Sequence, residues 1–222
     1  MKKQLLNTAI VFTLFGLSTQ VLNAQNWQWA KEALGVSYDD EGHGVGMDAN
    51  GNVYVTGRMQ DSCDFAGTLL VGGMFVAKYD SLGNLQWAKE SQGVLYEYGK
   101  QIRADANGNS YIIGGFRDTA TFGSNTVTSW GGVDIFVAKY DASGTNLWVK
   151  SSGSKNWDNA NSIALDASGN TYITGSFSDT AYFDATILTS GSSSNSDIFM
   201  TKYDASGTVQ WARKAGGTKY DN

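Results

Sequence analysis

The chain has 222 residues, a formal net charge of −5 and no proline, with one cysteine and one histidine. An acidic chain does not favour a duplex-binding surface, so we expect no nucleic-acid partner. One cysteine cannot form an intrachain disulfide, and one histidine leaves no cage of His and Cys ligands. We therefore expect no metal and no cofactor.

Residues 1–24 have the pattern of a secretory signal peptide. A basic start at Lys2 and Lys3 is followed by the apolar run LLNTAIVFTLFGL, and Ala24 offers a small residue for cleavage. The run is shorter than the roughly 20 residues that cross a bilayer. We expect a secreted, extracellular or cell-surface protein with no membrane span after cleavage; the alternative is an uncleaved anchor.

Three phrases then recur in a fixed order, about 60 residues apart. One phrase ends in a tryptophan followed by Ala or Val and then Lys or Arg, at Trp29, Trp87, Trp148 and Trp211. Another is DANGNVYVTG at 48–57, with close copies at 105–114 and 166–175. The last is FVAKYD at 75–80 and 136–141, and FMTKYD at 199–204. The chain is therefore built from an internal repeat.

Each unit predicts two antiparallel hairpins. The Asp-Ala-(Asn/Ser)-Gly-Asn phrase suits a tight reversal, because Asp bonds to the backbone and Asn and Gly tolerate left-handed backbone. KYDASGT followed by VQWARK repeats this logic, with Phe199, Thr201 and Tyr203 on one face of the strand and Met200 and Lys202 on the other. Four antiparallel strands per unit are the makeup of one β-propeller blade. We expect an all-β propeller built from four-stranded blades.

The combination of DxxGNxYxTG, a DIFVAKYD-like strand and GxxxW(A/V)K resembles the SBBP-type β-propeller repeats of secreted bacterial proteins. The resemblance covers nearly all of residues 27–222. It implies a propeller fold; proteins of this family usually have more repeats, and some end in a sorting domain. The first copy departs from the pattern at Gly73-Met74, where the others have Asp134-Ile135 and Asp197-Ile198.

The repeats divide the propeller region, residues 25–222, into predicted segments. These are an orphan strand at 27–33, blades at 42–91, 99–152 and 160–215, and the start of a further blade at 216–222. Propellers close with about four to eight blades, so about three blades make an incomplete ring. Two explanations are open: a fragment of a longer protein whose N-terminal strand completes the last blade, or self-association of several chains.

An aromatic residue followed by an acidic one recurs before each blade. The pairs, which are the candidate ligand-binding residues, are Tyr38 and Asp39, Tyr96 and Glu97, Trp157 and Asp158, and Tyr220 and Asp221. We expect them, with long loops around 61–73, 118–133 and 179–196, on the face opposite the Asp-Gly turns, where carbohydrate or protein would bind. The aromatics would stack on a sugar and the acids accept its hydroxyls. Alternatively, the acids accept backbone amides and the aromatics pack between blades.

Several single residues have simpler interpretations. Asp48, Asn50 and Asn52 have the alternate spacing of a calcium loop, but a hairpin turn explains them without a metal. Cys63 falls where the other copies have alanine, so we expect a buried, inert thiol. We expect His43 in a solvent-facing loop, and Lys78 and its counterparts solvated or paired with acids of a neighbouring blade.

The sequence favours a non-enzymatic binding or structural module, because no catalytic cluster stands outside the repeat. The alternative is an enzyme on the same scaffold, such as a glycoside hydrolase or lyase. Its residues would have to break the repeat symmetry, and the best such cluster is Asp39, Asp40, Glu41 and His43. We assign no catalytic residue.

Overall fold

The computed structural model describes residues 29–35, 39–191 and 196–217. The predicted signal peptide, Tyr38, Tyr220 and Asp221 lie outside these ranges. The described residues form fifteen strands: β1 (Leu34–Gly35), β2 (Glu41–Met47), β3 (Val53–Phe65), β4 (Thr68–Tyr79), β5 (Leu85–Ala104), β6 (Ser110–Phe122), β7 (Asn125–Thr128), β8 (Asp134–Tyr140), β9 (Asn146–Ser152), β10 (Asn159–Leu165), β11 (Thr171–Ser178), β12 (Thr180–Phe183), β13 (Thr186–Thr189), β14 (Ser196–Tyr203) and β15 (Val209–Ala215). No helix that could cross a membrane is found in them.

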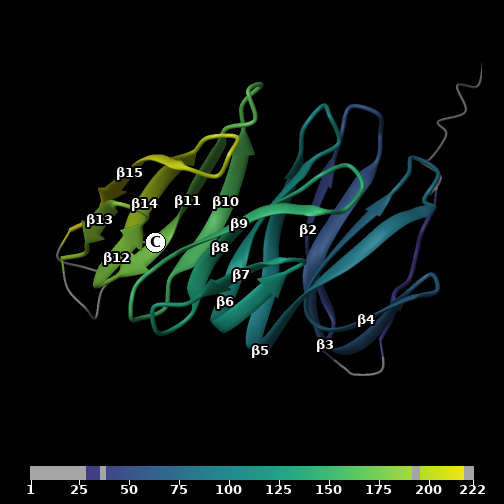
Figure 1. Ribbon diagram of the computed structural model, residues 1–222, viewed down its shortest axis with the longest axis horizontal. Coiled ribbons are helices and arrows are strands. Elements are labelled where there is room, and N and C mark those ends of the chain that lie inside the picture. Colours follow the sequence, from purple (N-terminus) through teal and green to yellow (C-terminus); the bar gives the residue numbers. More distant parts are fainter. Residues whose placement is uncertain (1–28, 36–38, 192–195, 218–222) are drawn as a thin grey trace, which may run out of the picture.

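The strands form three antiparallel blades, which stand side by side in Figure 1 from β3 and β4 to β14 and β15. Blade 1 consists of β2, β3, β4 and the first part of β5. Blade 2 consists of the second part of β5 with β6, β8 and β9. Blade 3 consists of β10, β11, β14 and β15. The predicted fold, an incomplete propeller of four-stranded blades, is confirmed.

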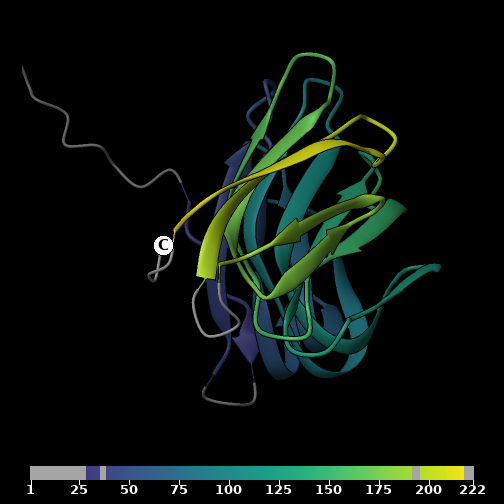
Figure 2. The ribbon, with the colours of Figure 1, turned by 90° about the vertical axis from the view of Figure 1, so that its left-hand side faces the viewer.

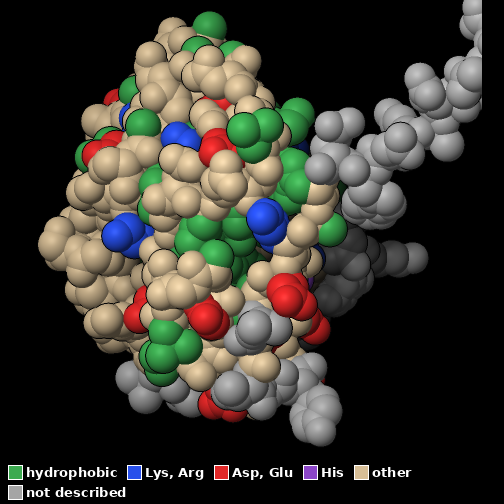
Figure 3. Space-filling model, turned by 90° about the vertical axis from the view of Figure 1, so that its right-hand side faces the viewer, with side chains coloured by type: hydrophobic (Ala, Val, Ile, Leu, Met, Phe, Trp, Pro, Cys, Tyr) green, Lys and Arg blue, Asp and Glu red, His purple; other side chains and the backbone are tan. Residues whose placement is uncertain are grey.

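Two ends of this row are seen in Figures 2 and 3. Figure 2 views the row end on with blade 3 nearest. Figure 3 views the opposite end, where hydrophobic side chains gather at the centre between basic and acidic ones. At this end Trp29, Val55 and Leu85 pack on the buried core of blade 1.

The Asp-Gly phrases form hairpin turns, as predicted. In the turn at Asp48, Oδ1 accepts the amides of Asn50 and Asn52 at 2.9 and 3.0 Å, and the glycine three residues on has a φ of +79°. Oδ2 accepts the Asn52 side chain at 2.7 Å and the Tyr54 hydroxyl at 3.1 Å. The carboxylate is thus engaged within its own hairpin, which supports the turn interpretation over a calcium loop.

Tryptophan joins each blade to the next. The Trp87 indole donates to the Ala142 carbonyl at 3.0 Å and lies against Gly144, where a Cβ atom would come within 2.7 Å of the ring. Trp148 makes the same contact with Ala205 at 3.3 Å. Glycine is therefore required in the KYDxxG turn for two reasons: the backbone has a positive φ there, and the indole approaches closely.

The prediction of an orphan strand at 27–33 was wrong for the residues that the structure describes. Residues 29–33 form no strand, and the following β1 pairs with Asp64 and Cys63 at the far end of β3. In each blade, the strand with this tryptophan phrase pairs with the KYD strand before it. Trp29 still donates to the Ser81 carbonyl, at 3.3 Å.

The stretches expected as long loops are mostly hairpins, which we call the arms. They are formed by the end of β3 with the start of β4, the end of β6 with β7, and β12 with β13. A phenylalanine from each arm packs on its blade; Phe122 and Phe136, for example, have ring centroids 4.8 Å apart. Cys63 lies in the first arm with 2% of its surface exposed, and burial raises the pKa of its thiol. The prediction of a buried thiol is confirmed.

The lysine and histidine predictions need correction. Lys78, Lys139 and Lys202 lie over tyrosine rings of their own blades, 4.9 to 5.2 Å from the ring centroids. Lys139 also donates to the Ala205 carbonyl at 3.4 Å, so a turn of the next blade replaces the acids we expected. His43 is exposed, as predicted, but it lies in strand β2 and not in a loop; its Nδ1 is 2.9 Å from the Gly99 carbonyl of blade 2.

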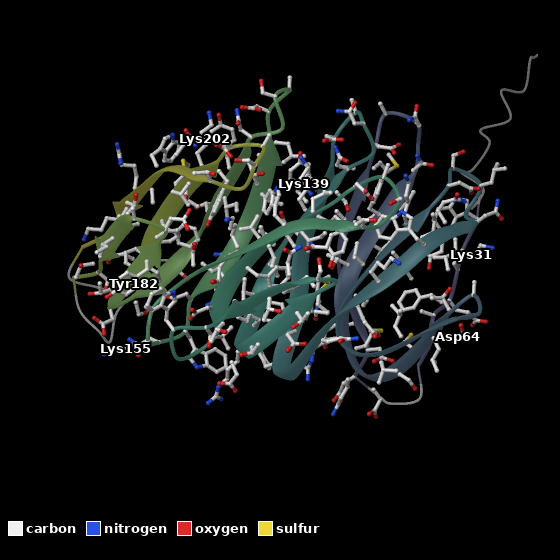
Figure 4. All side chains as sticks on the ribbon, viewed as in Figure 1. Lys31, Asp64, Lys139, Lys155, Tyr182 and Lys202 are labelled. Carbon is white, nitrogen blue, oxygen red and sulfur yellow. The ribbon has the colours of Figure 1, made fainter. Side chains whose placement is uncertain are left out.

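The blades have two distinct edges. Lys139 and Lys202, which precede Asp-Gly turns, lie along the upper edge in Figure 4, whereas Lys155 and Tyr182 lie along the lower one. Lys155 belongs to the connection between β9 and β10, and Tyr182 to an arm. We call the lower edge the connection face. It holds the segments that link one blade to the next.

Candidate functional site

The acids of the predicted pairs are buried at the junctions between blades. Asp158 is fully buried; its carboxylate accepts the backbone amides of Ser154 and Ser178. Glu97 holds the corresponding place before blade 2 and is 3% exposed. The contacts of Asp158 support the structural interpretation of that acid, because they hold the chain at the start of the inner strand β10.

In the first copy the acid that corresponds to Asp158 is Asp40, one position after the predicted Asp39. Asp40 accepts the Gln60 amide at 3.0 Å, just as Asp158 accepts the amide of Ser178 at 3.1 Å. Asp39 is exposed. Counting back from the turn aspartates Asp48 and Asp166 places Asp40 and Asp158 in the same position. Pairing each acid with the aromatic before it obscured this register.

The aromatic members of two pairs lie together on the connection face. Tyr96 and Trp157 have ring centroids 5.8 Å apart and are 44% and 58% exposed. The Arg58 guanidinium lies 5.5 Å from the Tyr96 centroid. Tyr96 has a φ of +55°, a conformation that costs energy in a non-glycine residue. These aromatics contact residues of neighbouring repeats, as the structural interpretation expects, but they also stay exposed and form a platform on this face.

A cavity of about 410 Å³ opens beside this platform, between blades 1 and 2. We call it the junction pocket. It is lined by Arg58, Met59, Gln60, Val71, Gly72, Gly73, Glu90, Ser91, Gln92, Gly93, Tyr96 and Glu97. Its volume lies within the range of roughly 300 to 1,000 Å³ typical of small-molecule sites.

Glu97 forms part of the pocket wall. Its Oε2 accepts the Ser91 hydroxyl at 3.2 Å, and its buried Oε1 has no hydrogen-bond partner. Burial raises the pKa of this carboxyl. Glu90 lines the same pocket and accepts the Val71 amide. The pocket thus has two carboxyl groups and one guanidinium.

The next junction shows why the pocket forms where it does. There Val133 and Asp134 replace Gly72 and Gly73, and both are buried. The Asp134 carboxylate accepts the Trp130 amide at 2.7 Å, and burial raises its pKa to about 7. Burial likewise raises the pKa of Asp158, to about 6. The departure at Gly73, visible in the sequence, therefore removes a side chain that fills this space elsewhere.

Sequence reasoning missed Arg58 and Glu90. Their counterparts in blade 2 are Gly115 and Ser151, so both break the repeat. A position-by-position comparison of the copies could have found them. The acidic cluster proposed for an enzyme does not line the junction pocket. Instead, His43 Nε2 lies 2.8 Å from Glu41 Oε2. No group of three or more His, Cys, Asp or Glu that suits a metal ion occurs in the part of the chain described.

The four-stranded repeats are joined by a tryptophan of one blade that contacts a turn of the next. This arrangement defines a β-propeller-type repeat protein. A family model described as a beta-propeller repeat, SBBP, matches residues 28–58 and confirms the resemblance seen in the sequence.

Two curated relatives are similar to this chain. One is an uncharacterized WD repeat-containing protein, L264, of Acanthamoeba polyphaga mimivirus, 27% identical over 56% of this chain and 11% of its own length. The other is the regulatory protein FlaEY of Caulobacter vibrioides, 29% identical over 63% of this chain and 15% of its own length. The chain therefore spans a small part of the relatives that it matches.

Proposed function

We propose that the chain is a secreted or cell-surface propeller that serves as a non-enzymatic binding module, with carbohydrate as its ligand on the connection face. The observation that carries this proposal is the exposed platform of Tyr96 and Trp157 beside the junction pocket. The signal-peptide pattern of residues 1–24 supports secretion.

The geometry suits a sugar in two ways. An aromatic ring offers a flat apolar surface on which a sugar face can stack, and Tyr96 and Trp157 expose such surfaces. The pocket beside them has the guanidinium of Arg58 as a donor and the carboxylate of Glu90 as an acceptor, which suits a ligand with many hydroxyl groups. Sites of this kind combine apolar walls with a few fixed polar groups.

Binding of sugars by the purified chain tests the proposal. Titration calorimetry with a panel of mono- and oligosaccharides should find a ligand, and W157A and Y96A should each weaken binding by about tenfold or more, since stacked aromatics carry much of the energy at such sites. W130A is the matched control. Trp130 is also an exposed tryptophan, but it stacks on Tyr182, whereas Trp157 contacts Tyr96, which lines the pocket. The proposal fails if no sugar binds, or if W130A weakens binding as much as W157A.

Assembly with further copies is a second candidate use, favoured by the end of blade 3. Met200 is 51% exposed there, whereas its counterparts Val76 and Val137 are buried against the next blade. A second copy would cover this face with its own blade 1. Light scattering after size exclusion should then give more than one chain per particle, and M200K should return single chains. A single chain at all concentrations contradicts assembly.

The enzyme alternative has its own test. If Glu41 and His43 were catalytic, E41A and H43A would abolish turnover of a glycan that the chain cleaves. We expect no turnover of bound sugar in the first place, which product analysis after prolonged incubation checks.

A further inference from the structure

Among the described residues, the two carboxyl groups of the junction pocket form no salt bridge. The salt bridges found among the described residues join His43 to Glu41 and Lys214 to Asp197, and neither involves Glu90 or Glu97. Arg58 lines the pocket, but its guanidinium lies over the Tyr96 ring. Glu97 is 97% buried with one oxygen unpartnered, which is costly for an ionised group.

Blade 3 shows how the same place is neutralised elsewhere in the molecule. Asp197, which corresponds to Gly73, is buried, and the ammonium group of Lys214 lies 3.2 Å from its Oδ2. The residue of blade 1 that corresponds to Lys214 is Glu90, because each lies three positions after the repeat tryptophan. Blade 1 thus replaces a lysine by an acid at this position.

In blade 1 the carboxylate at this place comes from a different residue than in blades 2 and 3. Glu97 Oε2 lies beside Gly73, where a Cβ atom would come within 2.8 Å of it. The longer side chain of Glu97 therefore brings an acid from the next repeat into the region that an aspartate occupies in blades 2 and 3. The result is a carboxylate without the lysine that accompanies it in blade 3.

We propose that the junction pocket binds a primary ammonium group, and that the ligand is an amino sugar with a free amine. The ammonium group supplies the donor that Glu97 Oε1 lacks and lies between the carboxylates of Glu97 and Glu90, and the sugar ring lies on Tyr96 and Trp157. This inference rests on the proposed function, because it names the sugar class that the same site selects.

The proposal implies a defined pH dependence. Burial raises the pKa of Glu97, so the carboxyl takes up a proton at a higher pH than an exposed glutamate. An ammonium ligand binds the ionised form. Affinity should therefore fall as the pH is lowered through the pKa of Glu97, while a ligand without the amine should show a smaller change.

The test measures, by titration calorimetry, how tightly the full chain binds four small molecules: glucosamine, N-acetylglucosamine, glucose and Nα-acetyl-lysine amide. The last of these has a free side-chain amine but no sugar ring. Glucosamine should bind about tenfold or more tightly than glucose and N-acetylglucosamine, as expected for a hydrogen bond between charged groups. E97Q should remove this preference. D158N is the matched control, since Asp158 is the corresponding buried acid before blade 3 and does not line the junction pocket. If E97Q does not fold, E90Q carries the same test.

The outcomes separate this inference from the proposed function. Equal affinity for all three sugars overturns the ammonium proposal but leaves carbohydrate binding intact. If only the lysine derivative binds, the result supports an ammonium site and overturns the proposal that the ligand is a sugar. Failure of all four molecules to bind the folded chain overturns both. A preference for glucosamine that survives in both E97Q and E90Q also overturns the proposal.

Discussion

Replacing Asp134 by asparagine should change how the stability of the protein depends on pH. Asp134 is fully buried between blades 2 and 3, with one oxygen bound to the Trp130 amide and the other unpartnered. Burial raises its pKa from 3.8 to about 7. Asparagine keeps an oxygen for the Trp130 amide and has no charge to bury.

The sign follows from the direction of the shift. Between pH 4 and pH 7 the folded protein keeps a proton on Asp134 that the unfolded chain releases, so stability is lost as the pH rises through this window. A shift of roughly three units, at about 1.4 kcal/mol per unit, is on the order of 4 kcal/mol. The free energy of unfolding of D134N, relative to the parent, should therefore rise by on the order of 4 kcal/mol from pH 4 to pH 7 and stay level above it.

Urea unfolding followed by tryptophan fluorescence, at half-unit steps from pH 4 to pH 8, measures this difference. Any constant cost of burying the amide cancels, because only the change with pH is compared. D158N provides a second curve, which should level off near pH 6, where the pKa of Asp158 lies. If the difference between D134N and the parent were the same at pH 4.5 and pH 8, Asp134 would titrate like an exposed acid and the burial argument would be refuted.

Two further predictions concern the blade junctions and the thiol. W87A should lower the free energy of unfolding by about 3 kcal/mol, because a large side chain and its hydrogen bond to Ala142 are lost. W211A should cost about 1 kcal/mol, since no turn in the described residues receives its indole; equal losses in the two variants would contradict this account of the junction. Cys63 should react with iodoacetamide slowly in the folded protein and rapidly in urea, because it is buried with a raised pKa. Fast labelling of the native protein would show that the first arm opens.

The strands and turns of the blades could be predicted because their signals are local. Each hairpin turn carries its own aspartate and glycine, and the φ of +83° at Gly144 is the conformation that such a turn needs. The alternation of Phe199, Thr201 and Tyr203 fixes the inward face of a strand without any knowledge of its neighbours. Repetition then extends each local signal to the other copies.

Features that depend on neighbouring blades could not be predicted in the same way. The stacking of Lys139 over Tyr111 requires knowing that the two strands pair side by side. The arms were missed because their short strands are interrupted where they leave the blade, at Asp118 and Asp179, which have positive φ. The junction pocket arises from the missing side chain at Gly73, and the space left by a glycine shows only when the surrounding residues are placed.

Strand β5 extends from Leu85 to Ala104, with register shifts between Gly93 and Gln101, so the outer strand of blade 1 continues into the inner strand of blade 2. Between blades 2 and 3, by contrast, the chain leaves β9 at Ser152 and begins β10 at Asn159. A pulling force applied to the outer edge of blade 1 therefore passes directly into the inner strand of blade 2. We expect these two blades to rupture as one mechanical unit, with blade 3 detaching separately at the bend between them.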